Sequence, residues 1–282
     1  MKPRSVSVSS HSRPEETGAA LRRIAELAGE LGVELRLSPG EVRKHGEIPG
    51  AVEVSEDDHE TDLAVILGGD GTILTHLRRY AGTGVPVFAV NYGAIGFLAT
   101  VEPSEVEDGV RRALEGDFDV MQLPVLRAEA ADGGRLAVND ISFHRRHNGR
   151  VAELAYSVEG EELGEVRCDG LVVSTPAGST GYNLANGGPV LAWGVEGFIV
   201  SFIAPHTLTA RALVVAPDDT LQVTNRSSSD PVDVITDGHS VGSLAPEAST
   251  AIRFSHREAL LAQAPGATFY HRLRDKFGRL SH

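Results

Sequence analysis

The chain has 282 residues, and its 26 basic and 39 acidic side chains give a formal net charge of −13. This charge would repel a phosphodiester backbone, so we expect no nucleic-acid partner. The single cysteine, Cys168, excludes an internal disulfide framework and a multi-cysteine metal site, and no apolar run approaches the roughly 20 residues of a membrane span, so we expect a soluble cytoplasmic protein without a membrane partner.

Strand and helix patterns alternate through the first 115 residues. Apolar residues recur at helical spacing from Pro14 to Leu31, which predicts a helix with Pro14 in its first turn. The next patterns predict strands over 5–8, 33–37, 63–67 and 85–90 and helices near 72–80 and 103–114. This alternation predicts an α/β domain with a parallel sheet, and ligands of such sheets bind at the carboxyl ends of the strands.

The sequence GGDGT at residues 68–72 follows a predicted strand and precedes a predicted helix. Its glycines allow a sharp turn and a close backbone approach, and a helix N-terminus favours negative charge, so the turn predicts a phosphate site. Asp70 would repel a phosphate unless it binds a metal ion, holds a hydroxyl group or takes a proton from one. The combination indicates phosphoryl transfer. The alternative is that Asp70 only caps the helix.

The pattern changes after about residue 118 to short β-rich runs separated by turns. These runs lie at 125–130, 136–144, 151–158, 171–174, 197–203, 213–215, 220–224 and 232–235. They predict a second, mainly antiparallel β-rich domain. We expect the α/β domain to span 1–120 and the β-rich domain 121–264, with 265–282 packing back on the first domain and a helix near 269–277.

A second glycine cluster, CDGLVVSTPAGSTGYN at residues 168–183, joins a buried strand to a polar loop. Such a loop can offer backbone amides, hydroxyl groups and an aromatic face to one ligand. The alternative is a turn with a structural proline. Ser179 does not lie in a G-x-S-x-G elbow, so we do not expect a nucleophilic serine.

Together these segments resemble the NAD kinase family from about Leu63 to Asp237. The motifs that carry the resemblance are GGDGT at 68–72, N-x-G-x-x-G-F-L at 91–98, Asn139-Asp140, D-G-L…S-T-P-x-G-S-T-x-Y at 169–182 and APHTL at 204–208. GGDG alone also occurs in diacylglycerol kinases and, in similar form, in phosphofructokinases. The joint occurrence of all five motifs in family order is specific to NAD kinases.

The resemblance implies phosphate transfer from ATP or polyphosphate to the 2′-hydroxyl of the adenosine ribose of NAD, giving NADP. It implies that Asp70 is the catalytic base, that Mg²⁺ or another divalent cation is the cofactor, and that the protein is a homodimer or homotetramer. No residue is assigned to the metal. The donor phosphates would meet Gly68, Gly69, Gly71 and Thr72.

The resemblance also implies a set of NAD contacts. Asn139 and Asp140 would hold the dinucleotide through polar contacts, and Asp169 would meet the nicotinamide half. The remaining expected contacts are Asp70, Gly71, Phe97, Arg150, Arg167, Thr180, Gly181, Tyr182, Asn183, Leu184, Ala185 and His239. For Arg150 and Arg167, an exposed role at a strand edge is the alternative.

The chain departs from the family pattern at three places. Asp140 stands where family members commonly have glutamate, Ala177 and Gly181 alter the second cluster, and His239 replaces a usual glutamine. The first two departures, at Asp140 and in the second cluster, keep open a regulatory module that binds NAD without chemistry. A lipid or sugar kinase that shares only the GGDG turn is a further alternative.

Overall fold

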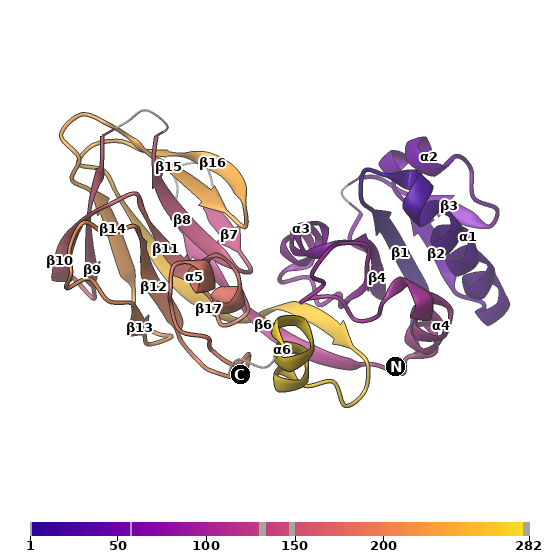
Figure 1. Ribbon diagram of the computed structural model, residues 1–282. Coiled ribbons are helices and arrows are strands. Elements are labelled where there is room, and N and C mark those ends of the chain that lie inside the picture. The colour runs from indigo at the N-terminus through magenta and orange to yellow at the C-terminus, as the bar shows by residue number, and fades with distance from the viewer. Residues whose placement is uncertain (1, 57, 130–133, 147–149, 279–282) are drawn as a thin grey trace. The chain divides into compact units, whose positions relative to one another are not determined.

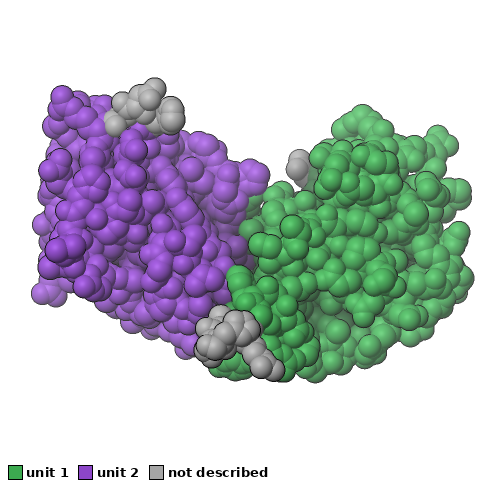
Figure 2. Space-filling model, in the orientation of Figure 1, with its two compact units in different colours: residues 1–122, 258–282 green, residues 123–257 purple. Residues whose placement is uncertain are grey.

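The computed structural model of the protein describes residues 2–56, 58–129, 134–146 and 150–278 (Figure 1). The chain divides into two compact units, one of residues 1–122 with 258–282 and one of residues 123–257 (Figure 2). Within the described ranges, no helix is both long enough and apolar enough to cross a membrane.

The first unit is built on a parallel sheet. Its strands are β1 (Ser5–Ser10), β2 (Glu34–Leu37), β3 (Ala51–Glu53), β4 (Leu63–Gly68) and β5 (Val87–Asn91), in the order β5-β4-β1-β2-β3, and the end of β17 (Ser249–Gln263) pairs in parallel with β5. Gly68 pairs with Asn91, and Ser10 pairs with Leu67. The segments that follow β1, β4 and β5 therefore all begin at the same edge of the sheet, where ligands of parallel sheets bind.

Helices and a buried apolar layer support this sheet. The helical elements are α1 (Pro14–Leu31), α2 (Pro39–His45), α3 (Asp70–Tyr80), η1 (Pro103–Glu105), α4 (Val106–Glu115) and α6 (Phe269–Phe277). Leu21, Ile24 and Leu27 lie at helical spacing on α1 and are fully buried in the core. Gly32 ends α1 in the left-handed conformation, with φ of 66°, which suits a residue without a Cβ.

The second unit contains a six-stranded antiparallel sheet. Its strands, in spatial order, are β13 (Leu213–Val215), β12 (Phe198–Ile203), β11 (Gly170–Ser174), β8 (Asp140–Arg145), β15 (Val232–Thr236) and β16 (His239–Leu244). The loop after β11 contains η2 (Gly178–Thr180) and α5 (Tyr182–Ala185). The other strands are β6 (Asp119–Ala128), β7 (Arg135–Ala137), β9 (Ala152–Val158), β10 (Glu161–Cys168), β14 (Leu221–Asn225) and β17 (Ser249–Gln263).

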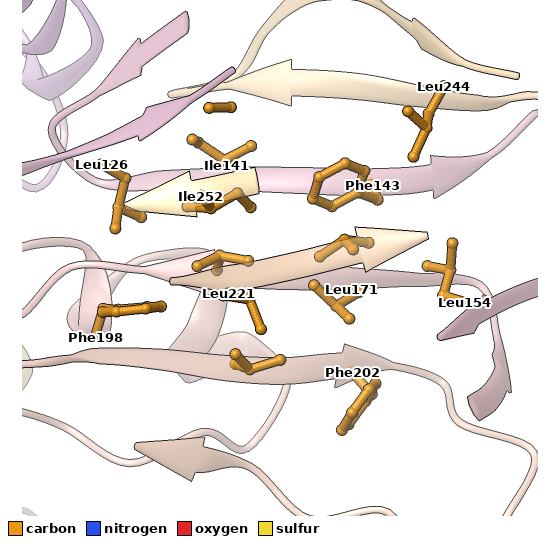
Figure 3. Close-up of a cluster of buried hydrophobic side chains, with 14 of the residues drawn as sticks. Leu126, Ile141, Phe143, Leu154, Leu171, Phe198, Phe202, Leu221, Leu244 and Ile252 are labelled. Carbon is orange, nitrogen blue, oxygen red and sulfur yellow. The ribbon is translucent and has the colours of Figure 1, made fainter. Parts of the chain in front are cut away.

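Alternation along β8 separates the core of the second unit from its polar face. Ile141 and Phe143 are fully buried in a cluster that also takes side chains from β9, β14 and β17 (Figure 3). Asp140, Ser142 and His144 fall on the opposite face, because successive side chains of a strand point to opposite sides. The six-stranded sheet thus has one apolar face in the core and one face with polar side chains on β8.

The predicted fold class is confirmed: an α/β unit with a parallel sheet and a mainly antiparallel β-rich unit. The helices predicted at 14–31 and 269–277 have those bounds in the structure. β10 and β17 were not predicted. β10 carries three glutamates and is an edge strand held by its pairing with β9. β17 bends where Arg257 has φ of 57°. For these reasons neither strand shows a regular alternation of apolar and polar residues.

Candidate active site

The GGDGT turn connects β4 to α3 at the carboxyl edge of the parallel sheet. A Cβ on Gly68 would lie 2.6 Å from Cβ of Thr72, and a Cβ on Gly69 would lie 3.0 Å from Cα of Gly93. Conversely, a Cβ on Gly93 would lie 2.7 Å from Cα of Gly69. The glycines therefore allow the turn and the loop after β5 to touch backbone against backbone.

The Asp70 side chain faces this neighbouring loop and does not cap its own helix. Gly69 occupies the N-cap position of α3. One carboxylate oxygen of Asp70 accepts a hydrogen bond of 3.0 Å from the N–H of Phe97, and the other accepts one of 2.9 Å from the N–H of Leu98. A carboxylate has about four lone-pair sites, so Asp70 can still accept a hydroxyl group.

The loop after β5 is fixed by Asn91 and Glu102. The side-chain oxygen of Asn91 accepts from the N–H of Gly93 at 3.0 Å, and its Nδ2 donates to Oε2 of Glu102 at 3.0 Å. Burial opposes the charge on Glu102, but hydrogen bonds from Lys276 and Asn91 outweigh it and hold the pKa of Glu102 below its ordinary value. The loop that anchors Asp70 therefore has its own polar supports.

In the second unit, Asp237 fixes the backbone of the Asn139-Asp140 pair. Its carboxylate accepts hydrogen bonds from the N–H groups of Val138 at 2.9 Å, Asn139 at 2.7 Å and Asp140 at 3.0 Å. Asp237 lies in the turn between β15 and β16, followed by Gly238 with φ of 80°. Sequence reasoning gave Asp237 no role, although its Asp-Gly dipeptide was a visible turn signal.

The second glycine cluster closes against the same backbone. The hydroxyl of Thr175 donates to the carbonyl of Val138 at 2.6 Å and accepts from the N–H of Gly178 at 3.0 Å. A Cβ on Gly178 would lie only 2.1 Å from the carbonyl oxygen of Asn139. Residues 138–140 and the loop after β11 therefore form one closely packed structure.

Asn139 and Asp140 hold buried polar atoms. Among the residues that the structure describes, Oδ1 of Asn139 is buried without a hydrogen bond, and the neighbouring Asp140 carboxyl group is also buried. Asp140 is 7% exposed, and burial, with a smaller contribution from Asp237, raises its pKa to about 7. Buried polar groups are normally paired, so these atoms are suited to bind a polar ligand.

We expect Asp140→Asn to become more stable relative to the wild type as pH rises. Between the ordinary pKa and about 7, the folded state keeps a proton on Asp140 that the unfolded state loses, so wild-type stability falls across this window. The advantage of the variant in unfolding free energy should grow by about 2–3 kcal/mol from pH 5 to pH 8. Denaturant unfolding at both pH values measures it.

Asp233→Asn is the control, because Asp233 is partly exposed on β15 and pairs with Arg146 at 3.0 Å. Its stability difference from the wild type should change little over the same pH range. If the difference in unfolding free energy between Asp140→Asn and the wild type were the same at pH 5 and pH 8, Asp140 would not titrate in this window.

An aromatic pair lies on the polar face of β8. The rings of His144 and Tyr182 stack with centroids 5.6 Å apart and planes at 9°. Burial is the main cause that raises the pKa of Tyr182, and the charges of Asp140 and Asp169 raise it further. The Tyr182 hydroxyl therefore lies within electrostatic reach of both carboxylates. Burial lowers the pKa of His144, so its ring is neutral at pH 7. Sequence reasoning did not identify His144.

Asp169 is held by an arginine that sequence reasoning also left without a role. Nε of Arg145 donates to Oδ1 of Asp169 at 2.6 Å, and the backbone N–H of Arg145 donates to the carbonyl of Asp169 at 3.0 Å. The structure therefore brings Asp140 and Asp169 within electrostatic reach of Tyr182, and Nδ2 of Asn139 lies 3.7 Å from a Cβ built on Gly181 in the same loop.

The other predicted NAD contacts differ from one another in burial and in hydrogen-bond partners. Asn183 is fully buried, and its Nδ2 closes the loop by donating to the carbonyls of Ser179 at 3.0 Å and Pro189 at 2.9 Å. Phe97 is also buried, so its backbone rather than its ring meets Asp70. The predicted residues that lie exposed or partly exposed around the second cluster are Thr180, Gly181, Leu184 and Ala185.

Arg150, Arg167 and His239 lie on the surface of the second unit. Arg167 is on the edge strand β10, where its Nε lies 3.2 Å from Oε1 of Glu153. His239 begins β16, directly after the turn that contains Asp237. In the described ranges, no group of three or more His, Cys, Asp and Glu side chains is arranged to hold a metal ion.

Two family models match the chain. The ATP-NAD kinase N-terminal domain matches residues 38–118, and the ATP-NAD kinase C-terminal domain matches residues 138–264. An NAD kinase of Gemmatimonas aurantiaca is 36% identical over 229 residues, covering 78% of this chain and 78% of that protein. An NAD kinase of Ralstonia nicotianae is 36% identical over 231 residues, covering 80% of this chain and 76% of that protein.

Solved structures agree in fold. An Archaeoglobus fulgidus NAD kinase in complex with ATP superposes with a TM-score of 0.76 at 28% identity, covering 97% of each chain. The yeast NADH kinase complexed with NADH superposes with a TM-score of 0.88, covering 99% of this chain and 88% of that one. At 20% identity, the yeast enzyme is evidence for the fold alone.

Proposed function

This chain belongs to the NAD kinase family of phosphotransferases, and on that premise we propose that it transfers the terminal phosphoryl group of ATP to NAD. The acceptor is the 2′-hydroxyl of the adenosine ribose, and the products are NADP and ADP. The observation that carries the proposal is the Asp70 carboxylate, anchored by two backbone N–H groups beside a glycine turn at the end of β4. The relatives named NAD kinase and the ATP complex of the Archaeoglobus enzyme support it.

Asp70 serves as the general base in this reaction. Its free lone pairs accept the proton of the 2′-hydroxyl while the ribose oxygen forms a bond to the γ-phosphorus of ATP. The bond from that phosphorus to the bridging oxygen breaks, and ADP leaves with the electron pair. The backbone around Gly68, Gly69, Gly71 and Thr72 holds the donor phosphates, with the N-terminus of α3 favouring their negative charge.

The polar face of the second unit holds the dinucleotide. Asn139 supplies an unpartnered oxygen atom and Asp140 a buried carboxyl group for ribose hydroxyl groups, and Asp169 meets the nicotinamide half. The stacked ring of Tyr182 offers a flat surface to a base. Further contacts come from Gly71, Phe97, Arg150, Arg167, Thr180, Gly181, Leu184, Ala185 and His239, whereas Asn183 shapes the loop from within.

Mg²⁺ fits the residues present at the glycine turn. Magnesium prefers oxygen ligands and is commonly held by one or two carboxylates together with substrate phosphates. Asp70 provides such a carboxylate with lone pairs to spare. The bound ion would neutralise charge that develops on the transferred phosphoryl group.

We propose further properties of the protein from the family resemblance and the net charge. Polyphosphate is an alternative donor, and the active form is a homodimer or homotetramer in the cytoplasm. The charge of −13 supports the absence of a nucleic-acid partner. The expected domain bounds of 1–120 and 121–264, with 265–282 returning to the first domain, are likewise a proposal.

NADP formation by the purified protein tests the proposed function. The protein is given NAD with ATP and Mg²⁺, with polyphosphate replacing ATP in a parallel reaction. NADP in either reaction supports the kinase and identifies its donor. Tight NAD binding without NADP would instead indicate a regulatory module, and phosphorylation of a lipid or sugar would indicate a kinase that shares only the GGDG turn.

A further inference from the structure

We propose that Arg272, on α6, is a positioning residue that holds the Asp70 carboxylate in place through the backbone of residues 97–99. The inference rests on the proposed function of Asp70 as the base. Arg272 is about 200 positions from Asp70 along the chain, and none of the sequence motifs includes it.

The guanidinium of Arg272 holds the far side of the segment that binds Asp70. Its Nη1 donates to the carbonyl of Phe97 at 2.9 Å and to the carbonyl of Ala99. Its Nη2 donates to the side-chain oxygen of Gln263, at the end of β17. Phe97 therefore donates its N–H to Asp70 while its carbonyl is held by Arg272, so the position of the carboxylate depends on the guanidinium.

The ring of Phe97 is fixed by the same helix. Phe97 is 6% exposed. Its ring centroid lies 6.1 Å from that of Phe269 and 5.6 Å from that of Phe277, which are the two end residues of α6. α6 thus holds Phe97 both by its ring and by its carbonyl oxygen.

The charges agree with this arrangement. Burial lowers the pKa of Arg272 to about 10, and the charge of Asp70 acts in the opposite direction. Arg272 is therefore still protonated at pH 7. Its positive charge lies within electrostatic reach of the Asp70 carboxylate.

A second clamp from α6 supports the start of the same loop. Nζ of Lys276 donates to Oε1 of Glu102 at 2.6 Å. Glu102 in turn accepts from Nδ2 of Asn91, whose oxygen accepts from the N–H of Gly93. Lys276 acts on Gly93, whereas Arg272 acts on residues 97–99, so Arg272 is the specific support for the two N–H groups bound to Asp70.

Loss of this support should reduce catalysis more than substrate binding. A base must lie close to the proton that it takes, and a displacement of about 1 Å can lower the rate by about 10²-fold. For Arg272→Ala we expect kcat to fall by about 10-fold to 10²-fold. The KM for ATP should stay within about threefold of the wild type, because Arg272 and the residues that it contacts lie outside the proposed donor-phosphate site.

Arg36→Ala is the matched control. Nη1 of Arg36 also donates to a backbone carbonyl, that of Glu60, and the residue lies on β2 in the same unit. Its removal should lower stability without changing kcat. Arg272→Lys, which keeps the charge but cannot reproduce the fork of donors, should have an intermediate kcat. Ethylguanidinium added to Arg272→Ala should restore part of the lost kcat, whereas a purely structural role predicts no recovery in the folded enzyme.

Amide hydrogen exchange of the full chain gives a second readout that needs no turnover. In Arg272→Ala, exchange at the N–H groups of Phe97 and Leu98 should speed up at least tenfold, while Arg36→Ala leaves it unchanged. Wild-type exchange at both groups, or a wild-type kcat in folded Arg272→Ala, would overturn the proposal. If the wild-type protein forms no NADP, the proposed function fails, and the exchange result alone decides whether Arg272 positions Asp70.

Discussion

Asp70→Asn is expected to lower kcat for NADP formation by about 10²-fold to 10⁴-fold, the usual contribution of a general base. Asparagine cannot take the proton from the ribose hydroxyl. It also keeps only one acceptor oxygen for the N–H groups of Phe97 and Leu98, so the unfolding free energy should fall by about 1–3 kcal/mol. Steady-state kinetics and denaturant unfolding measure the two effects separately.

Asp62→Asn separates loss of the base from loss of an anchor. The Asp62 carboxylate also accepts two backbone hydrogen bonds, from the N–H of Arg4 at 2.7 Å and of Ser5 at 3.3 Å. It lies just before β4, at the other end of that strand from the glycine turn. This variant should lose stability and keep its kcat. Equal losses of kcat in both variants, or full turnover by Asp70→Asn, would remove Asp70 from the role of base.

Gly178→Ala is expected to disrupt the proposed dinucleotide site. The new methyl group would lie 2.1 Å from the carbonyl oxygen of Asn139 and 2.5 Å from its carbonyl carbon, and neither backbone atom can rotate away. The loop after β11 must then separate from residues 138–140. We expect a loss of about 3 kcal/mol in unfolding free energy and loss of measurable NAD binding. Denaturant unfolding and titration calorimetry with NAD test this.

Gly194→Ala is the control for the added methyl group. No heavy atom lies within 4 Å of a Cβ built on Gly194, and its backbone is outside the left-handed region. Its stability and NAD affinity should match those of the wild type. Wild-type NAD affinity in Gly178→Ala would mean that the close contact with Asn139 is not needed for the site.

The predictable parts of the fold are those that local pattern determines. The helix over 14–31 follows from apolar spacing and from Pro14 at its start, and β4 follows from a continuous apolar run. α2 also had a local sequence signal, because Ser38 is followed by Pro39 and, three residues on, by Glu41. In the structure, Ser38 caps the helix by accepting a hydrogen bond from the N–H of Glu41. The segment is too short to show helical periodicity. β10 depends on pairing with β9, which a local pattern does not contain.

The residues of the candidate site likewise fall into those that local sequence predicts and those that it does not. Asp70 and Asn139 belong to compact motifs, so the residues next to them were enough to predict that they are functional residues. Asp237 and Arg272 act on backbone groups far away in the chain, and ordinary Asp-Gly and Arg residues carry no local sign of such partners. That Asp70 binds a loop rather than capping its own helix also depended on a contact between distant segments.

The division of the chain into units has a consequence for synthesis. Residues 123–257 are continuous, so the second unit can fold as soon as it leaves the ribosome. The first unit combines residues 1–122 with a stretch from 258 onward that carries Arg272 and Lys276. A nascent chain that stops before α6 therefore has both glycine motifs but lacks the helix that we propose holds Asp70 in place. Phosphoryl transfer should reach its full rate only after translation has passed residue 277.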